Sequence, residues 1–228
     1  MGRMPAIHES AEGVELETGP QPAAAVLWLH GLGADGHDFV PIVPELGLAG
    51  AVRFVFPHAP RRPVTINDGL VMRAWYDVLA LEGPRREDEA GIRESARRVE
   101  ALIARERERG IAPGRLVLAG FSQGGAMALQ VGLRHPAPLG GLVALSAYLP
   151  LAGVVPAEAS AAGRRARVFL AHGTGDPLIP LARARATRAA LEALGCTVEY
   201  HEYPMAHAVC EAEIRQLGAW LADRLAGP

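Results

Sequence analysis

Short apolar runs alternate along the chain with longer amphipathic stretches. The runs are rich in Val, Leu and Phe and mostly lack polar alternation, which is typical of strands buried on both faces of a parallel sheet. Strands are predicted over Ala24–Leu29, Val52–Phe56, Arg115–Ala119, Gly141–Ser146, Arg167–Ala171 and Thr197–Tyr203. Helices are predicted over Asp88–Arg109, Ser122–Arg134, Pro180–Leu194 and His207–Leu225. This repeated alternation predicts an α/β fold, with a doubly wound, mostly parallel sheet and helices on both faces.

Two segments between these elements are predicted to be loops. Pro57–Ala80 is long and non-repetitive, and such segments in compact domains often serve as binding loops or lids. Leu149–Arg165 is rich in Ala, Pro and Gly and is predicted to be a surface excursion with a short helix. Because no linker is long enough to separate two folding units, residues 1–228 are predicted to form one domain.

Composition narrows the range of functions. Half of the 228 residues are hydrophobic and 21% are charged, which predicts an ordered globular protein. The formal net charge of −2 argues against general affinity for nucleic acid or for anionic membranes. No run approaches about 18 consecutive apolar residues, so a cytoplasmic protein without stable membrane insertion is expected. The run Arg105–Arg109 alternates with Glu106 and Glu108 and is predicted to be a solvated helix face.

The most informative motif is the pentapeptide Gly120-Phe121-Ser122-Gln123-Gly124, a G-x-S-x-G pattern between a predicted strand and a predicted helix. Strand, sharp turn and helix is the setting that a nucleophile elbow requires. The flanking glycines let the backbone turn tightly, and the helix N-terminus beside the serine favours developing negative charge. Ser122 is therefore the candidate nucleophile, and a glycine-rich turn with a buried serine is the alternative.

A serine hydroxyl is a poor nucleophile unless a base takes its proton and a carboxylate orients that base. Reacting groups in open α/β sheets collect at the carboxyl ends of strands. Asp176 follows the predicted strand Arg167–Ala171, and His207 follows the predicted strand Thr197–Tyr203. The order Ser122, Asp176, His207 is typical of α/β-hydrolases. A helix-capping aspartate and a surface histidine without a role are the alternatives for the last two.

Other histidines fit the role of the base less well. His201 lies within a predicted strand, and His172 closes a strand and is predicted to bond to the backbone. His30 begins the glycine-rich loop after the first predicted parallel strand. That loop predicts one donor of an oxyanion hole, the backbone N–H of Leu32, and the N–H of Gln123 after the nucleophile is the other.

Six motifs carry a resemblance to a known family. They are Leu29-His-Gly-Leu-Gly33 with Asp38-Phe39, Pro57-His-Ala-Pro60, Ala74-Trp-Tyr-Asp77, Gly120-Phe-Ser-Gln-Gly-Gly125, His172-Gly-Thr-Gly-Asp-Pro177 and Tyr203-Pro-Met-Ala-His207. On these motifs the chain resembles the acyl-protein thioesterase and carboxylesterase family of α/β-hydrolases, also called the phospholipase/carboxylesterase family. The resemblance implies a serine hydrolase with Ser122 as nucleophile, Asp176 as orienting carboxylate and His207 as base, and it places the oxyanion hole at Leu32 and Gln123. Relatives cleave carboxylic esters, and some cleave thioesters or lysophospholipids.

The chain departs from the family pattern around the expected base. Ala206 stands where members often have Gly, and Ala208 stands where they often have a polar residue. We expect a slightly tighter loop and an intact base. Some eukaryotic thioesterases of this family carry N-terminal lipidation signals, and the absence of one here weakens the case for membrane-attached lipidated substrates.

The sequence defines the substrate less closely than the reaction. Candidate walls of an acyl pocket are Leu70, Met72, Trp75, Leu178 and Ile179, with ordinary core packing as the alternative for each. Apolar walls favour a small-molecule ester with a short-to-medium acyl chain. A thioesterase or lysophospholipase for longer chains is the alternative enzyme, and a non-catalytic binding module on the same fold is a remote one.

Metal and redox chemistry are not needed to explain these motifs. A metal hydrolase would leave the elbow unexplained, so no metal and no cofactor are predicted. Cys196 and Cys210 fit neither a metal spacing nor a disulfide framework; reduced thiols are the simpler interpretation, and a single bridge stays open. A homodimer is compatible with the resemblance, although no isolated apolar stripe demands one.

Overall fold

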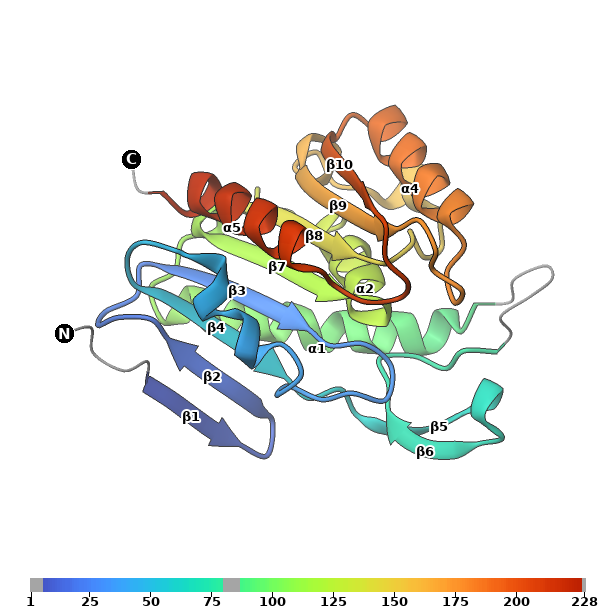
Figure 1. Ribbon diagram of the computed structural model, residues 1–228, viewed down its shortest axis with the longest axis horizontal. Helices are drawn as coiled ribbons and strands as arrows, with labels where there is room; N and C mark the ends of the chain where they lie inside the picture. The colour runs from blue at the N-terminus through green and yellow to red at the C-terminus, as the bar shows by residue number, and fades with distance from the viewer. Residues whose placement is uncertain (1–5, 80–86, 227–228) are drawn as a thin grey trace.

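The computed structural model describes residues 6–79 and 87–226, and a sheet runs through its centre (Figure 1). Eight strands lie in the order β1, β2, β4, β3, β7, β8, β9, β10. Their bounds are β1 Ala6–Ser10, β2 Gly13–Glu17, β3 Ala24–Leu29, β4 Val52–Pro57, β7 Leu116–Phe121, β8 Gly141–Leu145, β9 Arg167–Gly173 and β10 Thr197–Tyr203. The strands from β4 to β10 in this order are parallel to their neighbours, whereas β1 and β2 pair antiparallel. The predicted α/β fold with a mostly parallel sheet is confirmed.

The predicted strands are all present, with ends shifted by no more than two residues. The apolar runs missed β1, β2 and a separate hairpin of β5 (Arg61–Val64) and β6 (Leu70–Arg73). Strands β1 and β2 lie at the edge of the sheet, so they lack the continuous apolar run of a buried strand. The hairpin lies within the predicted loop Pro57–Ala80, and Val64 is the one buried residue of its two strands. Ala80, the last residue of that loop, lies outside the described residues.

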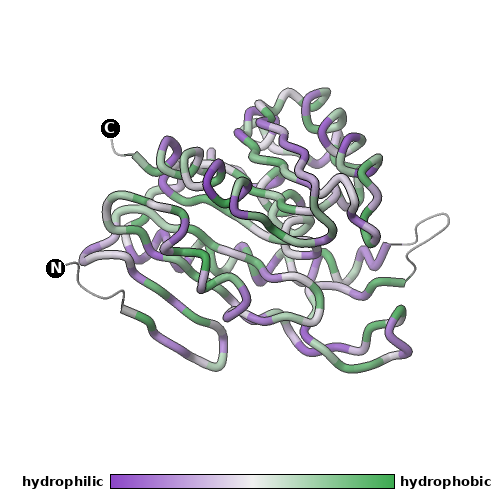
Figure 2. The backbone as a smooth tube through the Cα atoms, in the orientation of Figure 1, coloured by the Kyte–Doolittle hydropathy of each residue, from purple (hydrophilic) through white to green (hydrophobic). Residues whose placement is uncertain are grey.

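Helices cover both faces of the sheet, as predicted (Figure 1). One face packs against α1 (Glu89–Glu108), α2 (Gln123–Gly132) and α4 (Leu181–Leu194). The other packs against α5 (Glu211–Leu225) and the 3-10 turns η1 (Val40–Ile42) and η2 (Pro44–Leu46). The shorter elements are α3 (Val155–Glu158), η3 (Thr65–Asn67), η4 (Pro113–Arg115) and η5 (Gly163–Arg165). Figure 2 shows hydrophilic and hydrophobic residues alternating along α4 and α5, as expected for helices with one face on a core.

The predicted helix His207–Leu225 begins four residues later, at Glu211. Cys210, which precedes it, has extended backbone angles of φ −127° and ψ 163°. The N–H of Ala208 bonds to the carbonyl of Ala206, so the chain makes a turn there instead of a helix. His207 therefore stays in the loop between β10 and α5.

Strand register brings four loops to the same edge of the sheet. Leu29 at the end of β3 lies opposite Gly120 of β7, and Phe121 at the end of β7 lies opposite Leu145 of β8. Farther along the strand order, Tyr203 closes β10 beside Gly173, the last residue of β9. The loops that follow these strands are therefore neighbours, which is where open α/β sheets place their ligands.

The predicted solvated face over Arg105–Arg109 is wrong at Glu106, whose side chain is fully buried. Its carboxylate accepts hydrogen bonds from Arg53 Nη1 at 2.9 Å and from Arg109 Nη1 at 2.8 Å. Alternating charges could not reveal this, because Arg53 comes from β4, far away in the sequence.

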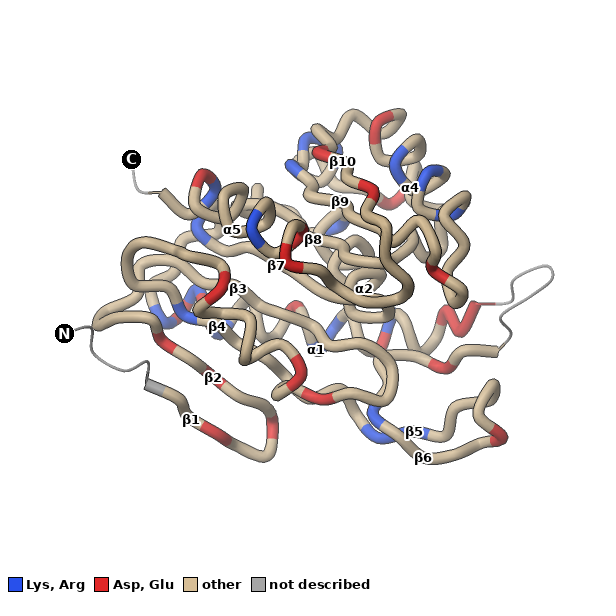
Figure 3. Tube along the Cα trace, viewed as in Figure 1, with Lys and Arg blue, Asp and Glu red and all other residues tan. Residues whose placement is uncertain are grey.

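Figure 3 shows acidic and basic residues interspersed along α1, α4 and α5.

Within the described ranges, none of the helices is both long enough and apolar enough to cross a membrane. Cys196 and Cys210 are free thiols. Burial raises the pKa of the Cys196 thiol to about 11, which keeps it protonated and poorly reactive at neutral pH.

Glu213, in the first turn of α5, is a fully buried carboxyl. Burial raises its pKa from 4.5 to about 8, against a smaller opposing effect of the Cys210 backbone. Between these two pH values the folded protein holds a proton that the unfolded chain has released. The contribution of Glu213 to stability should therefore fall as the pH rises through this range.

We expect Glu213→Gln to remove this pH dependence. The free energy of unfolding of the variant, minus that of the wild type, should rise by on the order of 2 kcal/mol between about pH 5 and pH 8. Urea denaturation at each pH measures the difference. Glu211→Gln is the control, because Glu211 is 85% exposed at the start of the same helix. Identical pH dependence in wild type and Glu213→Gln would show that this carboxyl is not held protonated by the fold.

Candidate active site

Ser122 stands at the turn between β7 and α2, with φ 53° and ψ −118°. A positive φ is strained for a residue with a Cβ and persists only where the flanking structure holds it. Close packing requires both motif glycines: a Cβ on Gly120 would lie 2.3 Å from the carbonyl carbon of Gly124. A Cβ on Gly124 would lie 2.0 Å from the carbonyl oxygen of Leu29. The turn is therefore tight, and it carries Ser122 to the carboxyl edge of the sheet.

Side chains from three strand ends form a continuous hydrogen-bonded chain. His207, in the loop after β10, has its Nε2 2.9 Å from Ser122 Oγ. Its Nδ1 lies 2.7 Å from Oδ2 of Asp176, which follows β9. This geometry suits an imidazole that carries its proton on Nδ1 and accepts another at Nε2.

Asp176 is held by the turn in which it lies as well as by His207. Its Oδ1 accepts hydrogen bonds from the backbone N–H groups of Leu178 and Ile179, at 2.8 and 2.9 Å. Burial acts to raise the pKa of Asp176, but the bonds from Ile179, His207 and Leu178 outweigh it and lower the pKa overall. The carboxylate therefore closes its turn, as a capping aspartate would, and remains ionised beside the imidazole.

Three other histidines make different contacts. His172 Nε2 lies 2.8 Å from the carbonyl oxygen of Ile179, which is a backbone contact of the kind that the sequence predicts, and 3.4 Å from Oδ2 of Asp176. His201 Nε2 lies 2.9 Å from a carboxylate oxygen of Glu199. Burial lowers the pKa of His30 to about 4, so its ring is neutral at physiological pH.

The backbone N–H groups of Leu32 and Gln123 belong to residues that line the same cleft as Ser122. Among the described residues, neither N–H has a hydrogen-bond acceptor. Gln123 is the first residue of α2, where the N–H groups lack intrahelical partners and the helix dipole favours negative charge. The loop that carries Leu32 approaches the serine closely, since a Cβ on Gly31 would lie 3.6 Å from Ser122 Cβ. Both N–H groups are therefore available to a ligand oxygen.

The cleft beside Ser122 has a volume of about 420 Å³. Two predicted pocket residues, Leu178 and Ile179, line it. Sequence reasoning missed the remaining large apolar and aromatic walls, which are Ile66, Tyr76, Val78, Phe121 and Tyr148. Phe121 and Tyr76 stand inside family motifs and could have been found there. Ile66 and Val78 lie in the candidate binding loop Pro57–Ala80, whereas Tyr148 carries no signal in the sequence.

Three predicted pocket residues lie outside the cleft lining, so their assignment needs correction. Leu70 is 63% exposed beside the turn of the β5–β6 hairpin, a structure that the predicted loop did not include. Met72 lies on the same hairpin, where its sulfur accepts a hydrogen bond from Asn67 Nδ2 at 3.3 Å. Trp75 is 1% exposed, and its indole N–H donates to the carbonyl of His30 at 2.9 Å.

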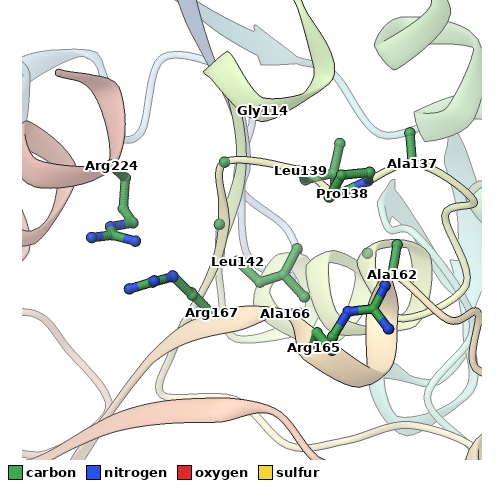
Figure 4. A pocket seen from close by; sticks show the side chains of 13 residues that line it. Gly114, Ala137, Pro138, Leu139, Leu142, Ala162, Arg165, Ala166, Arg167 and Arg224 are labelled. Carbon is green, nitrogen blue, oxygen red and sulfur yellow. The ribbon is translucent and has the colours of Figure 1, made fainter. Parts of the chain in front are cut away.

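A second cavity, of about 340 Å³, lies at the opposite edge of the sheet (Figure 4). The segments before β8 and β9 and the end of α5 line it, and Figure 4 shows Arg167 and Arg224 converging on one side while Arg165 lies across from them. No Ser, Cys or His is among its described lining residues, so it offers no nucleophile and base. Over the described ranges, no group of three His, Cys, Asp or Glu side chains could hold a metal ion.

Comparison with known proteins assigns the chain to a family. The model of the family described as Phospholipase/Carboxylesterase matches residues 12–224. Acyl-protein thioesterase 1 of Neurospora crassa is 38% identical over 215 residues, which cover 89% of this chain and 87% of the relative. Acyl-protein thioesterase 1 of Mycosarcoma maydis is 37% identical over 221 residues, which cover 90% of this chain and 92% of the relative.

Solved structures agree with this assignment. Arabidopsis thaliana SOBER1 matches with a TM-score of 0.83 at 31% identity, covering 89% of this chain and 99% of that chain. Zea mays acyl-protein thioesterase 2 matches with a TM-score of 0.80 at 26% identity, covering 99% of this chain and all of the other. The resemblance seen in the sequence motifs is confirmed: the chain belongs to the phospholipase/carboxylesterase family of α/β-hydrolases, a family of serine hydrolases, and is a hydrolase of ester or thioester bonds.

Proposed function

We propose that Ser122 attacks the carbonyl carbon of an acyl ester or thioester and forms an acyl-enzyme. The observation that carries this proposal is the hydrogen-bonded chain from Ser122 through His207 to Asp176. His207 Nε2 takes the serine proton as the bond from Oγ to carbon forms. It then gives that proton to the leaving alcohol or thiol as the bond from carbon to oxygen or sulfur breaks. Water, deprotonated by the same imidazole, cleaves the acyl-serine and restores Ser122.

Negative charge develops on the carbonyl oxygen during both halves of this reaction. In the proposal, the N–H groups of Leu32 and Gln123 receive that oxygen, and removing one such donor typically costs about 10²–10³ in rate. Positive charge develops on the imidazole of His207, and the ionised carboxylate of Asp176 stabilises it. These interactions strengthen as the transition state forms, which is why they accelerate the reaction.

For the substrate, an acyl thioester is proposed ahead of the short-to-medium carboxylic ester that the sequence favoured. Relatives at 38% and 37% identity carry the name acyl-protein thioesterase 1, which supports the thioesterase alternative. The cleft supports an apolar acyl chain, because Ile66, Val78 and Leu178 line it. Each methylene that enters such a cleft contributes about 0.8 kcal/mol of binding, so longer chains should be favoured until the cleft is filled.

We expect Ser122→Ala to fold normally and to lose the burst of leaving group that accompanies acylation. Its kcat should fall by on the order of 10⁶, because the variant lacks the hydroxyl that would carry the acyl group. Stopped-flow hydrolysis of a p-nitrophenyl ester measures both quantities, and Ser10→Ala, on the edge strand β1, is the matched control. A burst of wild-type amplitude in Ser122→Ala would remove Ser122 from the mechanism.

Matched substrates separate the thioesterase from the carboxylesterase. We expect kcat/KM to be higher for an acyl thioester than for the oxygen ester with the same acyl chain and a leaving group of the same size. Along a series from acetyl to octanoyl thioesters, kcat/KM should rise by roughly fourfold per added methylene, the equivalent of about 0.8 kcal/mol. Higher values for oxygen esters, with a maximum at acetyl, would instead support the carboxylesterase.

A further inference from the structure

Trp75 occupies a place that its sequence position did not suggest. Its side chain is buried beneath the cleft, 1% exposed, and its ring centroid lies 5.4 Å from that of His30. The indole N–H donates to the carbonyl oxygen of His30 at 2.9 Å. On the other side, the backbone carbonyl of Trp75 accepts a hydrogen bond from the hydroxyl of Ser95 on α1. Trp75 is therefore fixed to the start of the loop that carries Leu32.

The side chain of Gln123 also holds the segment that contains Trp75. Gln123 is 4% exposed, and its Oε1 accepts a hydrogen bond from the backbone N–H of Trp75 at 2.7 Å. Its Nε2 donates to the backbone carbonyl of Tyr76, also at 2.7 Å. A single amide thus satisfies two buried backbone groups, which would each cost stability if left unpaired. The residue whose N–H faces the cleft is also the residue that fastens the Trp75–Tyr76 segment.

His30 makes the far end of this connection rigid. Its Nε2 accepts the backbone N–H of Ala59 at 3.0 Å, so the ring proton resides on Nδ1. That Nδ1–H donates to the carbonyl oxygen of Gly31 at 2.7 Å. Because burial lowers the pKa of His30 to about 4, the ring keeps this neutral form at physiological pH. The backbone leading to Leu32 is therefore held by hydrogen bonds at both His30 and Gly31.

We propose that the side chains of Gln123 and Trp75 form a brace that sets the separation of the two oxyanion donors, the N–H groups of Leu32 and Gln123. The brace consists of the bonds from Gln123 to the Trp75 backbone and from the Trp75 indole to His30. This inference rests on the proposed function, because it requires that the two N–H groups bind the oxyanion. Neither side chain takes part in the chemistry itself. Gln123 and Trp75 act as positioning residues, through the N–H groups that they align.

A brace of this kind has a kinetic consequence that simple core packing lacks. Donors stabilise an oxyanion fully only when they are already aligned, and a misplacement of about 1 Å can cost about 10²-fold in rate. Loosening the brace should therefore weaken interactions that form with the tetrahedral intermediate, while interactions with the ground-state substrate change little. Damage to the wall of the cleft through Tyr76 would instead weaken both kinds of interaction together.

The test compares Gln123→Met with Gln130→Met. Gln130 lies on the same helix, is 1% exposed and accepts a hydrogen bond from Arg134 Nη1 at 2.9 Å, so the same substitution costs a buried bond away from Ser122. We expect Gln123→Met to lower kcat by roughly 10- to 100-fold with little change in KM. Gln130→Met should leave both constants at wild-type values.

Two inhibitors report the oxyanion site directly. Ser122 Oγ adds to the carbonyl carbon of an alkyl trifluoromethyl ketone, its proton passes to His207 Nε2, and the carbonyl π electrons move to the oxygen, which becomes a hemiketal oxyanion. The matching methyl ketone binds mainly as an unreacted ligand. Gln123→Met should lose affinity for the trifluoromethyl ketone in parallel with kcat and keep its affinity for the methyl ketone. Equal losses for both ketones, or wild-type affinity for both, would overturn the brace.

Trp75→Phe provides a second approach if Gln123→Met does not fold, as judged by urea denaturation. Phe cannot donate to the carbonyl of His30, but the backbone of residue 75 can still bond to Gln123. The same selective loss for the trifluoromethyl ketone is expected, and no selective loss would contradict the proposal. Fluorophosphonate labelling of wild type at Ser122 checks the proposed function separately, so a failed brace and a failed nucleophile give different results.

Discussion

The strained backbone at Ser122 is the constraint on which the site depends. A φ of 53° puts this residue in a conformation that costs on the order of 1–3 kcal/mol, so the surrounding structure must hold it. Strand β7 and helix α2 do so, because Gly120 and Gly124 allow the backbones of the turn and of β3 to approach within contact distance. The same turn carries the hydroxyl to the sheet edge and leaves the N–H of Gln123 unpaired beside it.

The parallel sheet brings the other groups to that edge. Strands β9 and β10 end side by side, and the loops after them carry Asp176 and His207 to within hydrogen-bond distance of each other. The two ends of the parallel strands differ in character. The apolar cleft lies at their carboxyl ends, and a cavity bordered by arginines lies where β8 and β9 begin. Loop geometry therefore decides the chemistry, while the buried strands supply a rigid frame beneath it.

Much of this fold could be predicted from the sequence, because buried parallel strands leave continuous apolar runs such as Ala24–Leu29 and Gly141–Leu145. Edge strands such as β1 and β2 leave no such run. The sequence alone was enough to propose Ser122, Asp176 and His207 as site residues, because each follows a strand inside a distinctive motif. Side-chain partners from distant segments were not: Glu106 is buried against Arg53, and Trp75 turned out to lie beneath the cleft instead of lining it. Apolar patterning shows that a side chain is buried, but not which neighbour it meets.

The central claim is that Ser122 is the activated nucleophile, and intact-protein mass spectrometry after treatment with a fluorophosphonate tests it most directly. We expect a single covalent adduct, mapped by peptide analysis to Ser122 and absent from the folded Ser122→Ala protein. Hydrolysis by a wild-type protein that forms no adduct, or an adduct mapped to another residue, would contradict it.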